Sequence, residues 1–269
     1  MDKSIKVELI TLVCFLLAGL LIAGGIFVLK LDDTPDNATS RALAEHSANR
    51  YLSKYHPESD YAVSSIVYEE KEERYRVRIS SEKSADSWFW VEFDAYGKLT
   101  DSSYEDYVGR KGNTAQRISI EYGNAIEQVL SPPPGCTEFS CYAGLYYKTA
   151  VAPNFDPDFG GDRIISDELE LDGIYDVAGF GSRSGWVSVT VEVDDASQVT
   201  EQNMADLLLY IRGMLDNAGL PFYDIDCSLE YPKGTSSKYM RLNDFLYTDI
   251  YEEGLVERVT EELRLQTIG

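Results

Sequence analysis

The sequence is poor in histidine, cysteine and basic side chains. Its 269 residues include two histidines and four cysteines, and 24 basic residues stand against 46 acidic ones. His46 and His56 lie in a different segment from every cysteine, so a zinc site would lack its second pair of ligands. The formal charge of −22 repels polynucleotides, and nucleic acid is therefore not a predicted partner. No nucleophile, base and orienting group can be singled out, which argues against an enzyme and against a cofactor.

One long apolar run stands at the start of the chain, where Leu9–Leu29 contains no charged residue. At about 1.5 Å of rise per residue, such a helix spans a hydrocarbon core of roughly 30 Å. The run is longer than that of a signal peptide and continues past Ala23-Gly24-Gly25, the one candidate cleavage site. Lys3 and Lys6 favour a cytoplasmic N-terminus. Residues 1–31 are thus predicted to be a cytoplasmic head and a single membrane-spanning helix, with a cleaved signal peptide as the alternative.

The rest of the chain is predicted to be extracytoplasmic and to form two domains. Its 44% hydrophobic content is sufficient for packed cores and excludes general disorder. In the first domain, residues 34–110, Thr34-Pro35 is typical of a helix start and His56-Pro57 of a helix end. Alternating segments follow at 62–70, 74–80 and 87–94. This pattern predicts a helix on an antiparallel meander.

The second and third of these segments each have one apolar face. The apolar positions are Tyr75, Val77, Ile79, Phe89, Val91 and Phe93. On the opposite face, Arg76 and Arg78 are expected beside Trp88 and Trp90 in a cation–π arrangement. Tryptophan and arginine dominate binding hot spots, so this face is the candidate surface for an envelope protein or a peptide. The alternative is that another helix, or the second domain, covers it.

The second domain, residues 113–269, has a pattern of helices alternating with strands. Asn113 is predicted to cap its leading helix, and Thr200 to cap a helix whose inner face contains Met204, Leu208 and Leu215. The other predicted elements are a strand at 145–151, hairpin strands at 174–178 and 186–193 around the turn Gly179–Gly185, a strand at 223–231 and a final helix from Asn243 to Leu263. The fold class is therefore α+β, with a transmembrane helix followed by two small domains of helices on antiparallel or mixed sheets.

The cysteines outside the apolar run fall into two groups. Cys136 and Cys141 lie close together after a triple proline, and outside the cytoplasm they are expected to form a disulfide that closes a small loop. Cys227 alternates with apolar residues on a predicted strand and is expected in the core.

An acidic string contains the one candidate metal site. Asp156, Asp158 and Asp162 offer carboxylates at alternating positions before glycines, as a calcium loop requires. Neither register fits the calcium motif, however. If the loop starts at Asn154, Phe159 falls where glycine is required, and if it starts at Asp156, Gly160 falls where a ligand is expected. An acidic surface loop is the alternative.

Three segments carry a resemblance to a known family: residues 51–61, the strand Tyr75–Ser80, and Gly219–Tyr223 leading into Asp224-Ile225-Asp226. With the N-terminal apolar run, they resemble the YfjL-like proteins of Gram-positive bacteria. The first domain is also similar to the helix-plus-meander modules of the PepSY and cystatin type. The resemblance implies a membrane-anchored location in the cell envelope, two domains, and a regulatory or peptide-binding role. It implies no site residues.

These observations together predict a single-pass, membrane-anchored extracytoplasmic protein that acts as a binding or interaction module. The alternative is an envelope enzyme, such as a metal-dependent hydrolase, that uses the acidic second domain. The sequence leaves the oligomeric state open.

Overall fold

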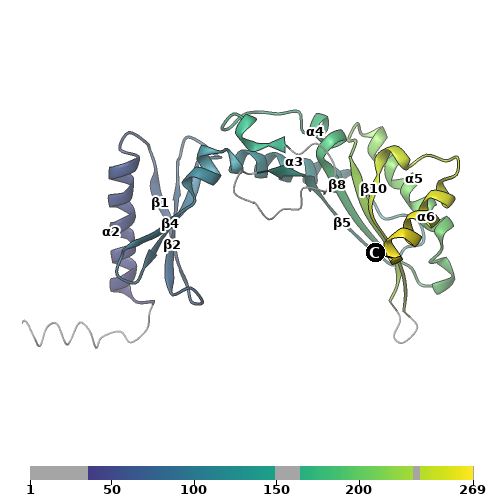
Figure 1. Ribbon diagram of the computed structural model, residues 1–269, viewed down its shortest axis with the longest axis horizontal. Helices are drawn as coiled ribbons and strands as arrows, with labels where there is room; N and C mark the ends of the chain where they lie inside the picture. The colour runs from purple at the N-terminus through teal and green to yellow at the C-terminus, as the bar shows by residue number, and fades with distance from the viewer. Residues whose placement is uncertain (1–35, 149–163, 233–236, 269) are drawn as a thin grey trace, which may run out of the picture. The chain divides into compact units, whose positions relative to one another are not determined.

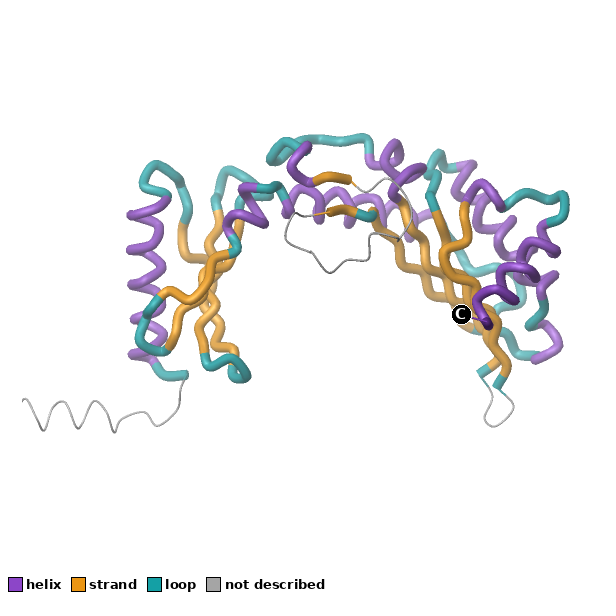
Figure 2. The backbone as a smooth tube through the Cα atoms, viewed as in Figure 1, coloured by secondary structure: helices purple, strands orange, loops and turns teal. Residues whose placement is uncertain are grey.

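The computed structural model describes residues 36–148, 164–232 and 237–268, and these residues form a mixed α+β fold (Figures 1 and 2). The mixed α+β class predicted from the sequence is thereby confirmed. The predicted membrane segment Leu9–Leu29 and the candidate calcium ligands Asp156, Asp158 and Asp162 lie outside the described residues. Within the described ranges, no helix is both long and apolar enough to cross a bilayer.

The chain divides into two compact units. Unit 1 comprises residues up to Lys83 together with Phe89–Ser103, and unit 2 comprises Ser84–Trp88 together with the chain from Tyr104 onward. The short segment Ser84–Trp88 thus groups with the second unit, although it lies within the first half of the sequence. The sequence pattern gave no indication of this arrangement.

Unit 1 is a helix on a four-stranded sheet. Its elements are α2 (Ala38–Tyr55), β1 (Ala62–Glu69), β2 (Arg74–Ser80), β3 (Trp88–Asp94) and β4 (Leu99–Ser102). The strands lie in the order β1-β2-β3-β4, with β1 antiparallel to β2 and β3 antiparallel to β4. Figure 1 shows α2 along one side of this sheet.

The core of unit 1 forms where the alternation predicts it. Tyr75, Val77, Ile79, Phe89, Val91 and Phe93 are all buried. The helix contributes Ala44, Ala48 and Leu52, and the two alanines allow its backbone to approach the sheet closely. The helix begins later than predicted, because Asn37 rather than Thr34 caps it: the Asn37 side chain accepts a hydrogen bond from Ser40 N at 2.8 Å.

Unit 2 is built on a second four-stranded sheet, with the order β10-β9-β8-β5. Its strands are β5 (Glu138–Leu145), β8 (Gly185–Glu192), β9 (Asp224–Tyr231) and β10 (Lys238–Leu246), and a separate parallel pair joins β6 (Tyr147–Lys148) to β7 (Ile164–Ile165). Strands β8 and β9 are parallel, and the β8–α5–β9 crossover connects them. The outer strands β5 and β10 are antiparallel to their neighbours.

Helices cover one face of this sheet. They are α3 (Gly112–Val129), α4 (Val177–Ser184), α5 (Glu201–Asn217) and α6 (Leu255–Ile268). Short turns of helix lie at Glu105–Gly109, Ser166–Glu168, Ala196–Gln198 and Tyr247–Asp249. The predicted inner face of α5 is buried, and so is Cys227 of β9. Thr200 caps α5 as predicted, since its side chain accepts a hydrogen bond from Asn203 N at 3.2 Å.

Several predicted elements of unit 2 are wrong. The segment Gly179–Gly185 belongs largely to helix α4 instead of a hairpin turn, and the strand predicted at 174–178 is replaced by a loop and the start of that helix. Of the strand predicted at 145–151, Leu145 is the end of β5, Tyr147–Lys148 form β6, and residues 149–151 lie outside the described residues. The helix predicted from Asn243 begins only at Leu255, because residues up to Leu246 pair with β9. In each case a contact with a distant part of the chain overrides the local pattern.

Candidate functional site

The arginine–tryptophan face of unit 1 is a network of charge pairs. The Arg76 guanidinium lies 4.7 Å from the centroid of the Trp90 ring, in the predicted cation–π arrangement. Arg74 and Arg76 both pair with Glu92, at 2.6 and 3.3 Å. Glu92 is buried, and its single carboxylate is shared between the two arginines. An anionic ligand gains little from arginines that are already paired in this way.

The four predicted binding residues do not belong to one unit. Arg76, Arg78 and Trp90 are half-buried residues of unit 1, whereas Trp88 belongs to the segment that groups with unit 2. The Trp88 ring packs against Tyr107, with 5.0 Å between the ring centroids. A binding role for these four residues stays a prediction.

Cys136 and Cys141 are free thiols in the structure, in place of the predicted disulfide. The two residues belong to different local structures. Cys141 lies on the extended strand β5, which begins at Glu138, whereas Cys136 lies before it, next to the turn after the prolines, where its N–H donates to the carbonyl oxygen of Pro133. Burial, and then the nearby Glu127, raises the pKa of Cys141 to about 12, which makes this thiol a poor nucleophile.

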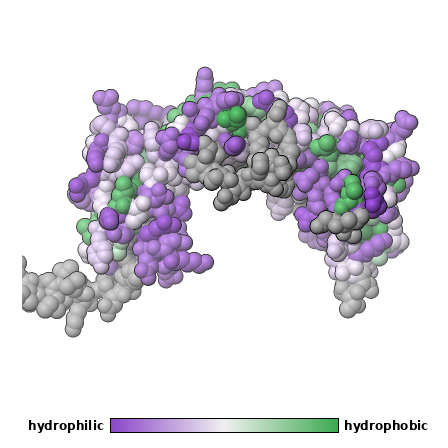
Figure 3. Space-filling view, viewed as in Figure 1, coloured by the Kyte–Doolittle hydropathy of each residue, from purple (hydrophilic) through white to green (hydrophobic). Residues whose placement is uncertain are grey.

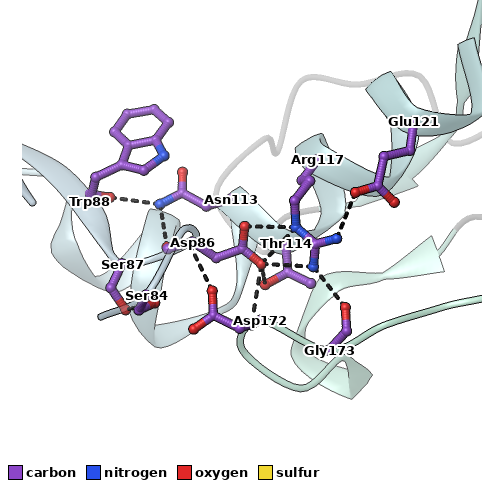
Figure 4. Close-up of polar contacts among 10 residues, drawn as sticks. All are labelled: Ser84, Asp86, Ser87, Trp88, Asn113, Thr114, Arg117, Glu121, Asp172 and Gly173. Atoms are coloured by element: carbon purple, nitrogen blue, oxygen red, sulfur yellow. Dashed lines mark hydrogen bonds and ion pairs between the residues drawn. The ribbon is translucent and has the colours of Figure 1, made fainter. Parts of the chain in front are cut away.

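Unit 2 contains a buried polar network that the sequence analysis missed (Figure 4). Asp86 is 2% exposed, and its carboxylate accepts hydrogen bonds from Arg117 Nε at 2.9 Å and Thr114 Oγ1 at 2.8 Å. The loop residue Asp172 donates its backbone N–H to Asp86 Oδ2 at 3.2 Å and accepts one from Asp86 N at 2.9 Å. Asn113 Nδ2 bonds the carbonyl oxygens of Asp86 and Trp88.

This network holds residues 84–88 against α3. The hydrogen bonds that Arg117 donates to the Asp86 carboxylate raise the pKa of Arg117, whose guanidinium also donates to Glu121 and to the carbonyl of Gly173. Because Arg117, Thr114 and Asp172 all donate to the Asp86 carboxylate, we assign Asp86 a structural rather than a catalytic role. A weak signal for it was present in the sequence: Asn113, Thr114 and Arg117 are polar residues in the first turns of a helix that is otherwise apolar on one face.

A second buried aspartate lies at the start of β9. Asp224 is 4% exposed, and Tyr146 Oη donates a hydrogen bond to its Oδ1 at 3.3 Å. Burial, and then the charges of Asp244 and Asp226, raises the pKa of Asp224 to about 7. This carboxyl group therefore exchanges a proton near neutral pH, but it is not exposed to a substrate.

The open face of the unit 2 sheet carries a row of acids at one end. In the strand register, Glu138 pairs with Glu192, and Glu192 pairs with Glu230, so three glutamates lie on neighbouring strands. Like charges at such positions repel one another. This end of unit 2 therefore disfavours an anionic ligand.

A pocket of about 310 Å³ lies between α5 and the proline loop of unit 2. Its apolar wall comes from β8, β9 and α5, with Val191, Leu207 and Leu229, and its mouth includes Pro133, Cys136 and Tyr210. Gln198 also lines it, and the Gln198 Oε1 atom is buried without a hydrogen-bond partner among the residues that the structure describes. Tyr210 Oη contacts Ser131 Oγ at 3.2 Å, which ties the proline loop to α5.

Candidate metal ligands do not converge in the described part of the chain, where no three His, Cys, Asp or Glu side chains are grouped to hold an ion. The pocket beside Gln198 has an apolar wall and a buried carbonyl oxygen, and it is therefore the candidate site of unit 2. Comparison of the chain with family models, with curated proteins and with solved structures gave no match, so the assignment of function depends on this geometry.

Proposed function

We propose that the protein is a single-pass membrane protein with two extracytoplasmic units that bind a ligand or partner in the cell envelope. The charge-free run Leu9–Leu29 supports the anchor, and the preceding lysines Lys3 and Lys6 support a cytoplasmic N-terminus. The large acidic remainder is suited to a soluble domain held at a membrane surface.

The observation that carries the binding proposal is the pocket of unit 2 with its buried, unpartnered Gln198 Oε1. A buried carbonyl oxygen without a partner costs free energy of about 1–3 kcal/mol, which a ligand donor would recover. The apolar residues Val191, Leu207 and Leu229 offer a surface for the body of that ligand.

The ligand class follows from the acceptors around the pocket. Gln198 presents an unpaired carbonyl oxygen, and Asp206 presents a carboxylate on an exposed turn of α5. Both favour a ligand that has an N–H, O–H or ammonium donor attached to an apolar group. A hydrophobic or aromatic side chain with its peptide N–H, presented by an envelope protein or peptide, meets these requirements.

Site-specific photo-crosslinking in intact cells tests the binding proposal. A photoreactive amino acid at Asp206, which lines the pocket, is compared with one at Glu201, which is exposed on the same helix outside the pocket. We expect a defined adduct at position 206 that Gln198→Leu reduces, because leucine has a similar size but no acceptor oxygen. Equal adducts at positions 206 and 201 would refute the proposal.

The anchor has a separate test. The full chain with a C-terminal tag is expected to stay with the membrane in alkaline carbonate, and the tag is expected to be cleaved by protease added to protoplasts. A tag that becomes accessible only after lysis would place the two units on the cytoplasmic side.

A further inference from the structure

A second pocket, of about 300 Å³, lies within unit 1 between α2 and the turn that joins β3 to β4. Its lining includes Arg50, Tyr51, Lys54 and Tyr55 from α2, and Phe93 and Leu99 from the sheet. Figure 3 shows a small hydrophobic patch where α2 lies beside the sheet of unit 1, within a largely hydrophilic surface. The pocket has an apolar floor, because Phe93 is buried in the core.

The walls of this pocket are fixed by backbone contacts. Asp94 Oδ1 accepts hydrogen bonds from the backbone N–H groups of Tyr96 and Lys98, each at 2.9 Å, which braces the β3–β4 turn. Gly97 has a φ of +75° and lies against α2, so that a Cβ there would be 2.7 Å from Ser47 Oγ. The turn therefore packs directly on the helix, and the pocket is preformed.

One wall of the pocket is aromatic. The Tyr51 and Tyr55 rings lie 4.9 Å apart between centroids, and Tyr51 Oη is held by Ser102 Oγ at 2.9 Å. Tyr55 is 52% exposed, although it is a large aromatic residue. A fixed ring beside an exposed ring provides a stacking surface for a flat apolar group.

The same pocket holds two cations but has no carboxylate in its described lining. Lys54 Nζ donates a hydrogen bond to Tyr55 Oη at 2.9 Å and lies 4.6 Å from the centroid of that ring. The Arg50 side chain forms no hydrogen bond or ion pair with any residue that the structure describes. Other arginines, such as Arg74, Arg117 and Arg212, pair with carboxylates.

The lack of a carboxylate is informative because the chain contains 46 acidic residues. Two unneutralised cations, one turn apart on α2, attract an anion in an otherwise negative protein. We infer that this pocket binds a small carboxylate with a flat aromatic body, whose anion lies between Arg50 and Lys54 and whose ring stacks on Tyr55. This site is separate from the proposed pocket of unit 2 and has the opposite charge preference.

The test compares two probes of nearly the same shape, 1-naphthylacetate and 1-naphthylacetamide, with the full chain in detergent. Equilibrium dialysis against the same detergent without protein corrects for partition of the naphthyl group. We expect the carboxylate to bind at least tenfold more tightly than the amide. We also expect Arg50→Gln/Lys54→Gln to remove that preference while leaving the weak amide binding in place.

The matched control is Lys71→Gln/Lys83→Gln, which removes the same charge from exposed positions of unit 1. The control should retain the carboxylate preference, and so should Gln198→Leu in unit 2. Equal affinity for the two probes, no binding of either probe, or an equal loss in the control would each overturn the inference. None of these outcomes bears on the crosslinking test of unit 2.

Discussion

Two aspartates of unit 2, Asp86 and Asp224, are almost equally buried but have opposite surroundings. The Asp86 carboxylate accepts hydrogen bonds from the guanidinium of Arg117, the hydroxyl group of Thr114 and the backbone N–H of Asp172. Within the described part of the chain, the Asp224 carboxyl group accepts one hydrogen bond, from Tyr146, and its charged neighbours Asp226 and Asp244 are acids. The comparison shows that two similarly buried carboxyl groups can have opposite surroundings, because Asp86 has a cationic hydrogen-bond partner whereas the charged neighbours of Asp224 are acids.

The two sites therefore contribute to the fold in different ways. The Asp86 network joins three segments that are distant in sequence, namely the 84–88 segment, α3 and the loop at 172–173. Asp224 is buried with no cationic partner among the described residues, and burial raises its pKa, so it is expected to make the stability of unit 2 depend on pH.

The largest effect is expected for Arg117→Gln, which leaves the carboxylate of Asp86 buried without its cation. Breaking one side of a buried pair costs about 3–5 kcal/mol, and we expect the lower end because the Arg117 side chain is 27% exposed. Hydrogen exchange, followed peptide by peptide, should show lost protection in residues 84–88 and in the first turns of α3. Denaturant unfolding should give the change in free energy.

The matched control for Arg117→Gln is Arg264→Gln, which removes an exposed pair with Glu261 on α6. Solvent screens such surface pairs, so this variant should be close to the parent protein in stability. If the two variants lose the same amount, the Asp86 network has no special structural role.

Asp224→Asn is expected to stabilise the protein at neutral and alkaline pH. The pKa of Asp224 is raised from 3.8 to about 7, so between pH 4 and 7 the unfolded chain loses this proton while the folded chain keeps it. The free energy of unfolding should therefore fall as the pH rises through this window, and then level off. At about 1.4 kcal/mol per pH unit the upper limit is about 4 kcal/mol, and we expect a gain of about 2 kcal/mol at pH 8.

Denaturant unfolding of the parent and of Asp224→Asn at pH 5, 6 and 8 isolates this group from the other acids. The stability difference between the two proteins should grow with pH and then become constant above pH 7. Asp206→Asn, which removes an exposed carboxylate from α5, is the control for the loss of one negative charge. A difference that does not change with pH would contradict the assignment of a raised pKa to Asp224.

The sequence predicted those parts of the fold that depend on local periodicity. The alternation in β2 and β3 identified the buried residues of unit 1, and the helical spacing in α5 identified Met204, Leu208 and Leu215. Each of these patterns is decided by neighbours within a few residues, because one face of the element must be apolar.

The predictions failed where a distant contact decides the structure. Gly181 and Gly185 were interpreted as parts of a hairpin turn, but a Cβ at Gly181 would collide with the carbonyl oxygen of Pro221, and one at Gly185 would lie 2.5 Å from Tyr122 Oη. These glycines are needed for close packing around Tyr122 and not for a turn. Likewise, the residues from Asn243 to Leu246 were predicted to begin the final helix but belong to strand β10, which pairs with β9. The two candidate pockets could not be predicted, since each joins elements that are far apart in sequence.

Asn113→Ala should cost about 2 kcal/mol, although the sequence assigned Asn113 only a helix cap. Its side chain instead donates to two backbone carbonyl oxygens, Asp86 O at 2.7 Å and Trp88 O at 2.6 Å, in a buried position. Removing the amide leaves these two acceptors without their donor. Asn203→Ala removes a similar hydrogen bond from an exposed position, where Asn203 Nδ2 donates to the backbone carbonyl oxygen of Gln198 at 2.6 Å. Water replaces that bond, so a loss from Asn203→Ala as large as that from Asn113→Ala would contradict the argument.

The smallest of these effects is expected at Thr200, the other predicted helix cap and the one that the structure confirms. The Thr200 hydroxyl accepts from Asn203 N at 3.2 Å, and Thr200→Ala should cost about 1 kcal/mol because that N–H then bonds only water. Thr200→Ser keeps the acceptor and should recover most of the loss, as measured by denaturant unfolding and by exchange of the first amides of α5. If serine is as harmful as alanine, the methyl group of Thr200 matters more than its hydroxyl.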